Sequence, residues 1–158
     1  MTSPSPFGSG KAKRHHRWSW LGCVSMSADR AIYLDSSAIV KLAVAEAESA
    51  ALRGYLRRRR PLVSSALART EVGRALAPFG PTAVGRGEEV LARVDLVRVS
   101  DRLLDAAARL LPAELRSSDA IHLATARRLG ASLARVVTYD ERMFEAARVM
   151  GWTVVAPS

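Results

Sequence analysis

The sequence predicts an α/β fold: a single three-layer domain with a mostly parallel central sheet flanked by helices. From residue 31 onward, short runs rich in β-branched residues alternate with longer stretches rich in Ala and Leu. This alternation indicates right-handed crossover connections, which place helices on both faces of a parallel sheet. The sequence contains no evident repeat, and 158 residues suffice to bury one core. We predict one folded domain over 31–158, preceded by a disordered extension over 1–30.

Two strands and their helices account for the first half of this domain. AIYLD at 31–35 and PLVSS at 61–65 are short apolar and β-branched runs, which are typical of buried strands. The stretch between them, 37–60, carries Ala and Leu at helical spacing and predicts one or two helices. ALARTEVGRAL at 66–76 predicts the helix after the second strand.

The second half repeats the alternation and completes the sheet. Residues 82–94 predict a helix in spite of their glycines, and ERMFEAARVM at 141–150 predicts the last helix. The other elements follow from the same criteria: strands at 95–100 (DLVRVS), 134–138 (ARVVT) and 153–156 (TVVA), and helices at 101–111 and 117–129.

The composition indicates a soluble globular protein of the reducing cytosol. Hydrophobic residues make up 49% of the chain, and no run approaches the roughly 18 apolar residues of a membrane span. The single cysteine, Cys23, cannot form an internal disulfide. The net charge of +9 favours a polyanionic partner. Part of this charge lies in the first 30 residues, so charge alone does not establish binding to nucleic acid.

The first 30 residues do not continue the pattern of the domain. MTSPSPFGSGKAK is rich in Ser, Pro and Gly, which favours a disordered extension. The basic KAKRHHR before WSWLGCVSM superficially resembles a signal peptide, but its apolar part is interrupted. Met26 lies immediately before the patterned region and offers an alternative start, so we expect a cytoplasmic protein.

Four acids lie where the carboxyl ends of the parallel strands should meet. Asp35 ends the first strand, and Asp140 stands two residues past the end of the fourth. Glu71 lies on the helix after the second strand, and Asp119 opens the helix that leads to the fourth. The functional crevice of such a sheet lies beyond the carboxyl ends of its strands. We therefore expect these four side chains to gather at one rim.

Each acid taken alone has an ordinary explanation, but the four together favour a cation. The separate explanations are Ser117 or Ser118 capping the helix of Asp119, Asp140 capping the last helix, Glu71 pairing with Arg74, and Asp35 starting a turn. Four carboxylates packed together repel unless a cation screens them. Oxygen ligands suit Mg²⁺ or Mn²⁺, and such a site suits phosphodiester hydrolysis by water that the metal activates.

The four acids lie in motifs that resemble those of a known family. YLDSSAIVKL (33–42), TEV (70–72), SSDAIHLATA (117–126) and VVTYDERM (136–143) resemble, in order and in context, the four acid motifs of the PIN-domain ribonucleases. The subgroup that they resemble is the VapC-type toxins of prokaryotic toxin–antitoxin pairs. The resemblance runs from about residue 31 to residue 157, which is nearly the whole predicted domain.

This resemblance implies a Mg²⁺- or Mn²⁺-dependent endoribonuclease. Its metal ligands would map onto Asp35, Glu71, Asp119 and Asp140. Ser37 would support the first acid, and Thr138 would lie beside the fourth; such groups orient carboxylates and water. The partners implied are an RNA substrate, a cognate antitoxin protein that blocks the acidic site, and a second copy of the chain in a homodimer.

Two further groups of residues leave two interpretations open. His122, one turn after Asp119, either faces the acids and acts on a proton or belongs to the packing of its helix. The four arginines at 57–60 either contact RNA phosphates or close a helix end, where positive charge complements the helix dipole. Arg116, three residues before Asp119, is the candidate contact for the scissile phosphate.

Two other classes of function remain alternatives. A catalytically silent binding module of the same fold would hold the four acids by Arg pairs instead of a metal. A receiver-like phosphotransfer domain also gathers acids at a sheet edge, but it needs an Asp at the end of its third strand and a Lys at a later strand end. Here Asp101 comes only after the third strand, and Lys41 is the last lysine of the chain.

Overall fold

The computed structural model describes residues 30–112 and 115–158, so nearly all of the predicted N-terminal extension lies outside the described residues. The strands are β1 (Ala31–Leu34), β2 (Leu62–Ser65), β3 (Asp95–Val97), β4 (Leu133–Val137) and β5 (Val154–Val155). The helices are α1 (Ser36–Ala43), α2 (Ser49–Leu56), α3 (Ala68–Leu76), α4 (Pro81–Leu91), α5 (Asp101–Ala107), α6 (Ser117–Arg127) and α7 (Glu141–Val149), with short 3₁₀ turns η1 (Ala77–Phe79) and η2 (Gly130–Ser132).

The five strands form one sheet in the order β3-β2-β1-β4-β5, in which each neighbouring pair is parallel. β1 pairs with β2 through Ile32 opposite Leu62, and with β4 through Leu34 opposite Val137. The chain therefore extends the sheet from β1 to β3 and then returns to add β4 and β5 on the other side of β1. The predicted parallel sheet is confirmed, and β1 lies at its centre.

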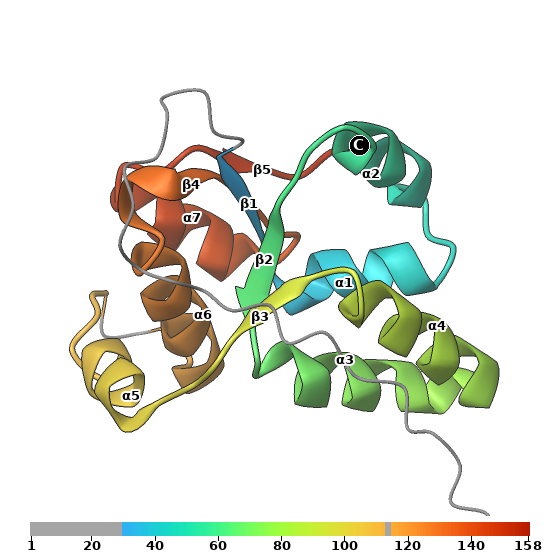
Figure 1. Ribbon diagram of the computed structural model, residues 1–158, viewed down its shortest axis with the longest axis horizontal. Helices are drawn as coiled ribbons and strands as arrows, with labels where there is room; N and C mark the ends of the chain where they lie inside the picture. The colour runs from blue at the N-terminus through green and yellow to red at the C-terminus, as the bar shows by residue number, and fades with distance from the viewer. Residues whose placement is uncertain (1–29, 113–114) are drawn as a thin grey trace, which may run out of the picture.

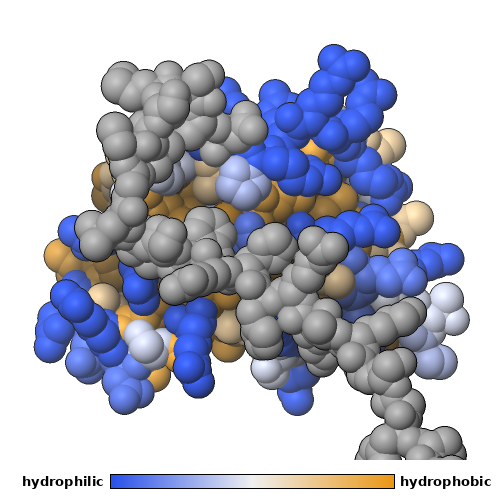
Figure 2. Space-filling model, in the orientation of Figure 1, coloured by the Kyte–Doolittle hydropathy of each residue, from blue (hydrophilic) through white to orange (hydrophobic). Residues whose placement is uncertain are grey.

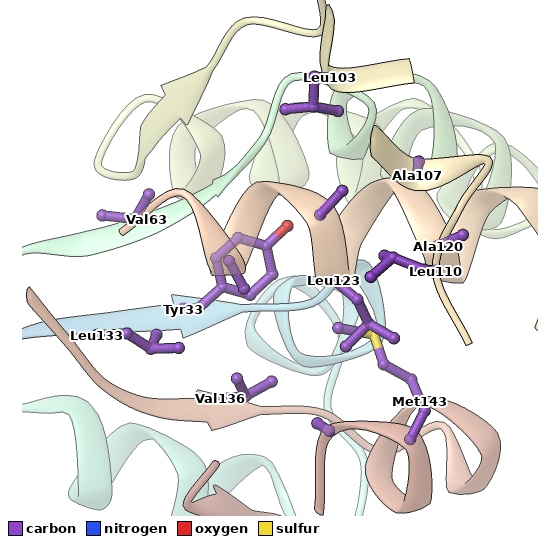
Figure 3. Packing of buried hydrophobic residues seen from close by; sticks show 14 of the residues in the cluster. Tyr33, Val63, Leu103, Ala107, Leu110, Ala120, Leu123, Leu133, Val136 and Met143 are labelled. Atoms are coloured by element: carbon purple, nitrogen blue, oxygen red, sulfur yellow. The ribbon is translucent and has the colours of Figure 1, made fainter. Parts of the chain in front are cut away.

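Helices cover both faces of the sheet, which confirms the predicted three layers (Figure 1). Successive side chains of a strand point to opposite faces. Tyr33 of β1 packs with Leu123 of α6 and Met143 of α7 in one core, as Figure 3 shows. Ile32 and Leu34 contribute to the other core, which is completed by α1 to α4. The alternation along β1 thus serves two separate hydrophobic cores.

Some element boundaries differ from the sequence prediction because side chains cap the helices. The stretch 37–60 contains two helices, and the first begins at Ser36 because Asp35 caps it. β3 ends at Val97 rather than at residue 100, since Ser100 accepts a hydrogen bond from the backbone of α5 and starts that helix. The other predicted elements begin and end within four residues of their observed bounds.

The packing of α3 on α4 depends on a glycine. A Cβ atom added to Gly87 of α4 would lie 2.4 Å from Cδ1 of Leu76 and 3.1 Å from Cγ1 of Val72, two buried side chains of α3. Gly85, on the same helix, has no such neighbour within 4 Å. A methyl group at position 87 would therefore force the buried side chain of Leu76 to shift, whereas position 85 has room for one.

The arginines at 57–60 follow α2 and precede β2, at the rim opposite the carboxyl ends of the strands. Arg59 donates to the carbonyl of Tyr55, and its guanidinium lies 3.9 Å from the centre of the Tyr55 ring. Arg60 donates to the carbonyl of Leu56 at 2.9 Å. These two arginines therefore close the end of α2, and the other two are exposed.

The surface is mainly hydrophilic at the periphery of the view in Figure 2, and apolar side chains show between the hydrophilic ones. Among the residues that the structure describes, the exposed large apolar side chains are Phe79, Leu104, Leu111 and Val149. Within residues 30–112 and 115–158, no helix combines the length and the hydropathy that crossing a membrane requires.

Candidate active site

The four predicted acids lie at the carboxyl rim of the sheet, around the point where the strand order reverses. β2 and β3 continue the sheet on one side of β1, and β4 and β5 continue it on the other. Such a switch point opens a crevice between neighbouring crossovers. Asp35 follows β1, and Asp140 follows β4 at the start of α7. Glu71 and Asp119 reach the same region from α3 and α6.

Asp35 is the most firmly held of the four acids. Its Oδ2 accepts hydrogen bonds from the hydroxyl of Ser37 at 2.7 Å and from that of Thr138 at 3.0 Å. The backbone N–H of Ser37 approaches the same oxygen at 3.4 Å, which makes Asp35 the N-cap of α1. The side chain is almost fully buried, so these donors offset the cost of burying a carboxylate.

The hydroxyls of Ser37 and Thr138 also join the two strand ends. Ser37 Oγ accepts from the backbone N–H of Tyr139 at 2.9 Å, and Thr138 Oγ1 accepts from that of Asp140 at 3.1 Å. The resemblance places Thr138 beside the fourth acid. In the structure it donates to the first acid, Asp35, and meets the fourth through the backbone alone.

Asp119 is buried and only partly satisfied. Its Oδ1 accepts from Ser118 Oγ at 3.3 Å, whereas Oδ2 is buried and has no hydrogen-bond partner among the described residues. Burial, followed by the charges of Asp140 and Asp35, raises the pKa of Asp119. The ordinary explanation of Asp119, in which Ser117 or Ser118 caps the helix, is wrong, because Arg116 occupies the N-cap position without a side-chain bond.

Glu71 is paired with a histidine and not with Arg74, the partner that its ordinary explanation gave it. The hydroxyl of Ser36 donates to Glu71 Oε2, and Nε2 of His122 lies 2.7 Å from the same oxygen. Burial alone would raise the pKa of Glu71, but the hydrogen bonds from His122 and Ser36 outweigh it and lower the pKa. The Glu71 carboxylate is therefore held in its ionised form.

His122 is buried within α6 and contacts four side chains. Its Nε2 lies 3.3 Å from Oγ of Ser36. Its Nδ1 lies 2.7 Å from the hydroxyl of Tyr33, and its Nε2 lies 3.8 Å from Oδ1 of Asp35 in addition to the Glu71 contact. Burial would lower the pKa of His122, but the bond to Glu71 and the nearby carboxylates raise it. The ring is therefore part of the packing and also faces the acids, while a role of His122 in moving a proton stays a prediction.

Asp140 caps the last helix, as one of the ordinary explanations predicts. Its Oδ1 accepts from the backbone N–H of Met143 at 3.0 Å at the start of α7. The cap does not remove this acid from the group, since its charge contributes to the raised pKa of Asp119. A cavity of about 310 Å³ opens beside it, with Tyr139 and Phe144 in its lining.

The donor set of this rim fits a hard divalent cation. The hydrogen bonds described above fall on one oxygen of each carboxylate, and the second oxygen of Asp119 is buried with no partner among residues 30–112 and 115–158. As arranged, no three His, Cys, Asp or Glu side chains of residues 30–112 and 115–158 are grouped closely enough to share one ion. Binding a cation would therefore require the carboxylates to turn toward it.

The structure argues against both alternative classes of function. A silent module would hold the acids by Arg pairs, but in the part of the chain that the structure describes their only ion-pair partner is His122. A receiver-like sheet has the order 2-1-3-4-5. Here β3 is an edge strand in the order 3-2-1-4-5, so the receiver-like alternative is wrong.

Sequence reasoning missed two residues of the site, Ser36 and Tyr33. Ser36 follows Asp35 directly, and only the next residue, Ser37, was expected to support an acid. A buried tyrosine hydroxyl needs a partner, so the strand residue Tyr33 carried a signal that such a partner exists. The spacing of residues along the chain cannot identify that partner as His122.

The parallel sheet in the order β3-β2-β1-β4-β5 and the acids at its switch point together define the class of protein to which this chain belongs. The family model of the PIN domain matches residues 32–149, and the chain belongs to this family. Among curated relatives it is 63% identical to Ribonuclease VapC46 of Mycobacterium tuberculosis (strain ATCC 25618 / H37Rv). That similarity spans 128 residues, which are 81% of this chain and 98% of the relative. The predicted resemblance to VapC-type PIN ribonucleases is confirmed.

Two solved structures share the fold. The crystal structure of VapC20 from Mycobacterium tuberculosis, described as a sarcin–ricin loop cleaving toxin, aligns with a TM-score of 0.64 and 20% identity over 80% of this chain and 99% of that one. A toxin–antitoxin complex from Klebsiella pneumoniae aligns with a TM-score of 0.62 and 22% identity over 80% and 98% of the two chains. At these identities the similarity concerns the fold.

Proposed function

We propose that this chain is a metal-dependent endoribonuclease that acts as the toxin of a toxin–antitoxin pair and hydrolyses RNA phosphodiester bonds. The observation that carries the proposal is the buried carboxylate of Asp119. Its Oδ2 has no hydrogen-bond partner within the described part of the chain, and Asp140 and Asp35 lie close enough to raise its pKa. A cation relieves both the repulsion and the unsatisfied oxygen. The name of the 63% identical relative, a VapC ribonuclease, supports the same reaction class.

The residues that would hold the cation are Asp35, Glu71, Asp119 and Asp140. Carboxylate oxygens favour Mg²⁺ or Mn²⁺ over softer metals. When bound, such an ion supplies positive charge that activates water and stabilises the charge on the phosphate oxygens. The chain's own contribution is to keep the carboxylates ionised and oriented, and the hydroxyls of Ser37 and Thr138 do so for Asp35.

The proposal also includes an RNA substrate and protein partners. The acidic rim repels phosphate unless the cation is present, so RNA binding and metal binding would be coupled. Arg116 is exposed at the start of α6 and offers positive charge near the acids. The Klebsiella pneumoniae structure is a toxin–antitoxin complex, which supports a cognate antitoxin for this chain. A homodimer and a cytoplasmic location belong to the same proposal.

The proposal is tested by incubating a small-RNA pool with the purified chain in Mg²⁺ or Mn²⁺, in EDTA, and with Asp35→Asn or Asp119→Asn. We expect discrete fragments with metal, and none with EDTA or with either variant. Asp95→Asn is the matched control, because Asp95 is exposed at the start of β3, away from the carboxyl rim. Fragments that persist in both site variants would refute the assignment, since they would come from another nuclease.

A further inference from the structure

Three buried or half-buried groups form a continuous chain of contacts between β1, α6 and α3. The hydroxyl of Tyr33 lies 2.7 Å from Nδ1 of His122, and Nε2 of the same ring lies 2.7 Å from Oε2 of Glu71. Tyr33 and His122 are almost completely buried, whereas the Glu71 side chain is 28% exposed. This series of contacts therefore leads from the core of the domain outward to Glu71, one of the four acids.

The chemistry of the three groups determines which of them donates each hydrogen bond. The Tyr33 phenol carries its proton at neutral pH, because the ordinary pKa of a tyrosine is about 10. A neutral His122 ring then accepts from Tyr33 at Nδ1 and donates its Nε2–H to Glu71. A protonated ring also carries the Nε2–H. The donation to Glu71 is thus available in either state of the ring.

The contact to Glu71 is specific rather than a by-product of packing. A buried imidazole needs partners at both nitrogens. The core on which α6 packs is mainly apolar, with side chains such as Leu123, and the buried hydroxyl of Thr125 on the same helix donates to the carbonyl of Ile121. The partners that the structure supplies are side chains from other elements: Tyr33, Glu71 and, at 3.3 Å from Nε2, the hydroxyl of Ser36, which are 89, 51 and 86 residues away in the sequence. The Tyr33 hydroxyl fixes the ring plane, and the ring fixes one carboxylate oxygen.

We infer that His122, oriented by Tyr33, is a positioning residue that holds Glu71 for the divalent cation. This inference rests on the proposed function, because it assigns Glu71 to the same metal site. Because Oε2 accepts from Ser36 and contacts His122, Oε1 would be the oxygen left to bind the ion. His122 acts through Glu71 and does not itself contact the substrate.

The first test compares His122→Leu with His122→Gln by calorimetric titration with Mn²⁺. The amide of Gln places an N–H donor near the position of Nε2, whereas Leu fills the space without a donor. We expect His122→Leu to weaken Mn²⁺ binding by about 10–100-fold, the usual effect of removing a group that orients a metal ligand. His122→Gln should recover most of that affinity.

A matched control separates positioning from a general loss of stability. Ser49 is a buried residue outside the site, and its hydroxyl bonds to the backbone of Val44 and Glu46. Ser49→Ala should lower the melting temperature and leave Mn²⁺ affinity unchanged. If His122→Gln binds Mn²⁺ as weakly as His122→Leu, or if His122→Leu binds like the wild type, the positioning role is wrong.

The ring itself gives a readout that needs no metal. In the metal-free wild type in alkaline buffer, ¹⁵N spectra of the His122 ring should show the proton on Nε2. Tyr33→Phe should remove the partner of Nδ1 and allow both tautomers, which keeps the test available if His122→Leu fails to fold. A proton on Nδ1 in the wild type would overturn the inference, since Nε2 could not then donate to Glu71.

The outcomes also separate this inference from the proposed function. A wild-type chain that binds no Mn²⁺ and cleaves no RNA would refute both. A wild-type chain that binds Mn²⁺ and cleaves RNA, with a His122→Leu variant that does both equally well, would refute only the role of His122.

Discussion

The hydroxyl of Thr138 lies 3.0 Å from Oδ2 of Asp35, although 103 residues separate the two in the chain. The contact joins the ends of β1 and β4, the two neighbouring strands between which the sheet order reverses. The same hydroxyl accepts from the backbone N–H of Asp140. One threonine therefore fixes the position of one acid relative to another.

The first prediction concerns this threonine. Thr138→Val keeps the shape of the side chain and removes the donor to Asp35, so Mn²⁺ affinity and RNA cleavage should fall by about tenfold or more. Thr138→Ser keeps the hydroxyl and should retain most of both. Cleavage rates measured over a range of Mn²⁺ concentrations would check this, and equal rates for the two variants would rule the prediction out.

The second prediction concerns the stability of the metal-free protein. The pKa of Asp119 is raised, so the folded state favours its protonated form, and ionisation destabilises the fold as pH rises above the ordinary value of 3.8. Asparagine resembles the protonated carboxyl. In EDTA at neutral pH, Asp119→Asn should melt at a higher temperature than the wild type, and the difference should disappear in strong acid.

Thermal melts in EDTA across pH would check this second prediction, with Asp95→Asn as the control for removing an exposed acid. Excess Mn²⁺ should reverse the order at neutral pH, since a ligand at about 100 times its dissociation constant stabilises a protein by about 2.7 kcal/mol. A lower melting temperature for Asp119→Asn in EDTA would show that another group already satisfies this carboxylate.

The third prediction distinguishes two glycines of α4. Gly87→Ala places a methyl group 2.4 Å from Leu76 Cδ1 and should destabilise the fold by about 1–3 kcal/mol through overpacking. Gly85→Ala meets nothing within 4 Å and should stabilise the helix by about 0.4–1 kcal/mol. Urea unfolding of the two variants would check the sign of each effect, and effects of equal sign would contradict the packing described here.

The fourth prediction compares two arginines, Arg116 and Arg58, that lie at opposite rims of the sheet. Arg116→Ala should lower kcat/KM for RNA by about tenfold, which corresponds to the loss of one hydrogen bond to a charged group. Arg58→Ala should leave kcat/KM nearly unchanged, because Arg58 lies at the opposite rim of the sheet. Steady-state cleavage of one defined RNA at several salt concentrations would check both. A larger effect at Arg58 would move the RNA path to that rim.

The fold and the rim of the sheet could be predicted from patterns along the chain. Alternating strands and helices imply parallel strands, and parallel strands bring their carboxyl ends together. That rule placed Asp35 and Asp140 at one rim from their positions at the ends of predicted strands. The metal role of these acids stays a prediction, as does the role of Arg116.

The contacts within the site could not be predicted in the same way. The pairing of Glu71 with His122 depends on how α3 and α6 approach across the sheet, whereas local spacing suggested Arg74. The contact of Thr138 with Asp35 depends on the pairing of β1 with β4, which no local pattern specifies. Long-range side-chain contacts depend on tertiary packing, and sequence periodicity gives only the face on which a residue lies.

The central position of β1 has a consequence for the synthesis of this chain. The rim needs Asp35, from near the start of the domain, and also Thr138 and Asp140, which the ribosome adds near its end. Until β4 emerges, β1 lacks one of its two neighbours, and Asp35 lacks one of its hydroxyl donors. A nascent or truncated chain that stops before residue 138 therefore contains no complete site, so an enzyme of this design would become active only when its translation is nearly finished.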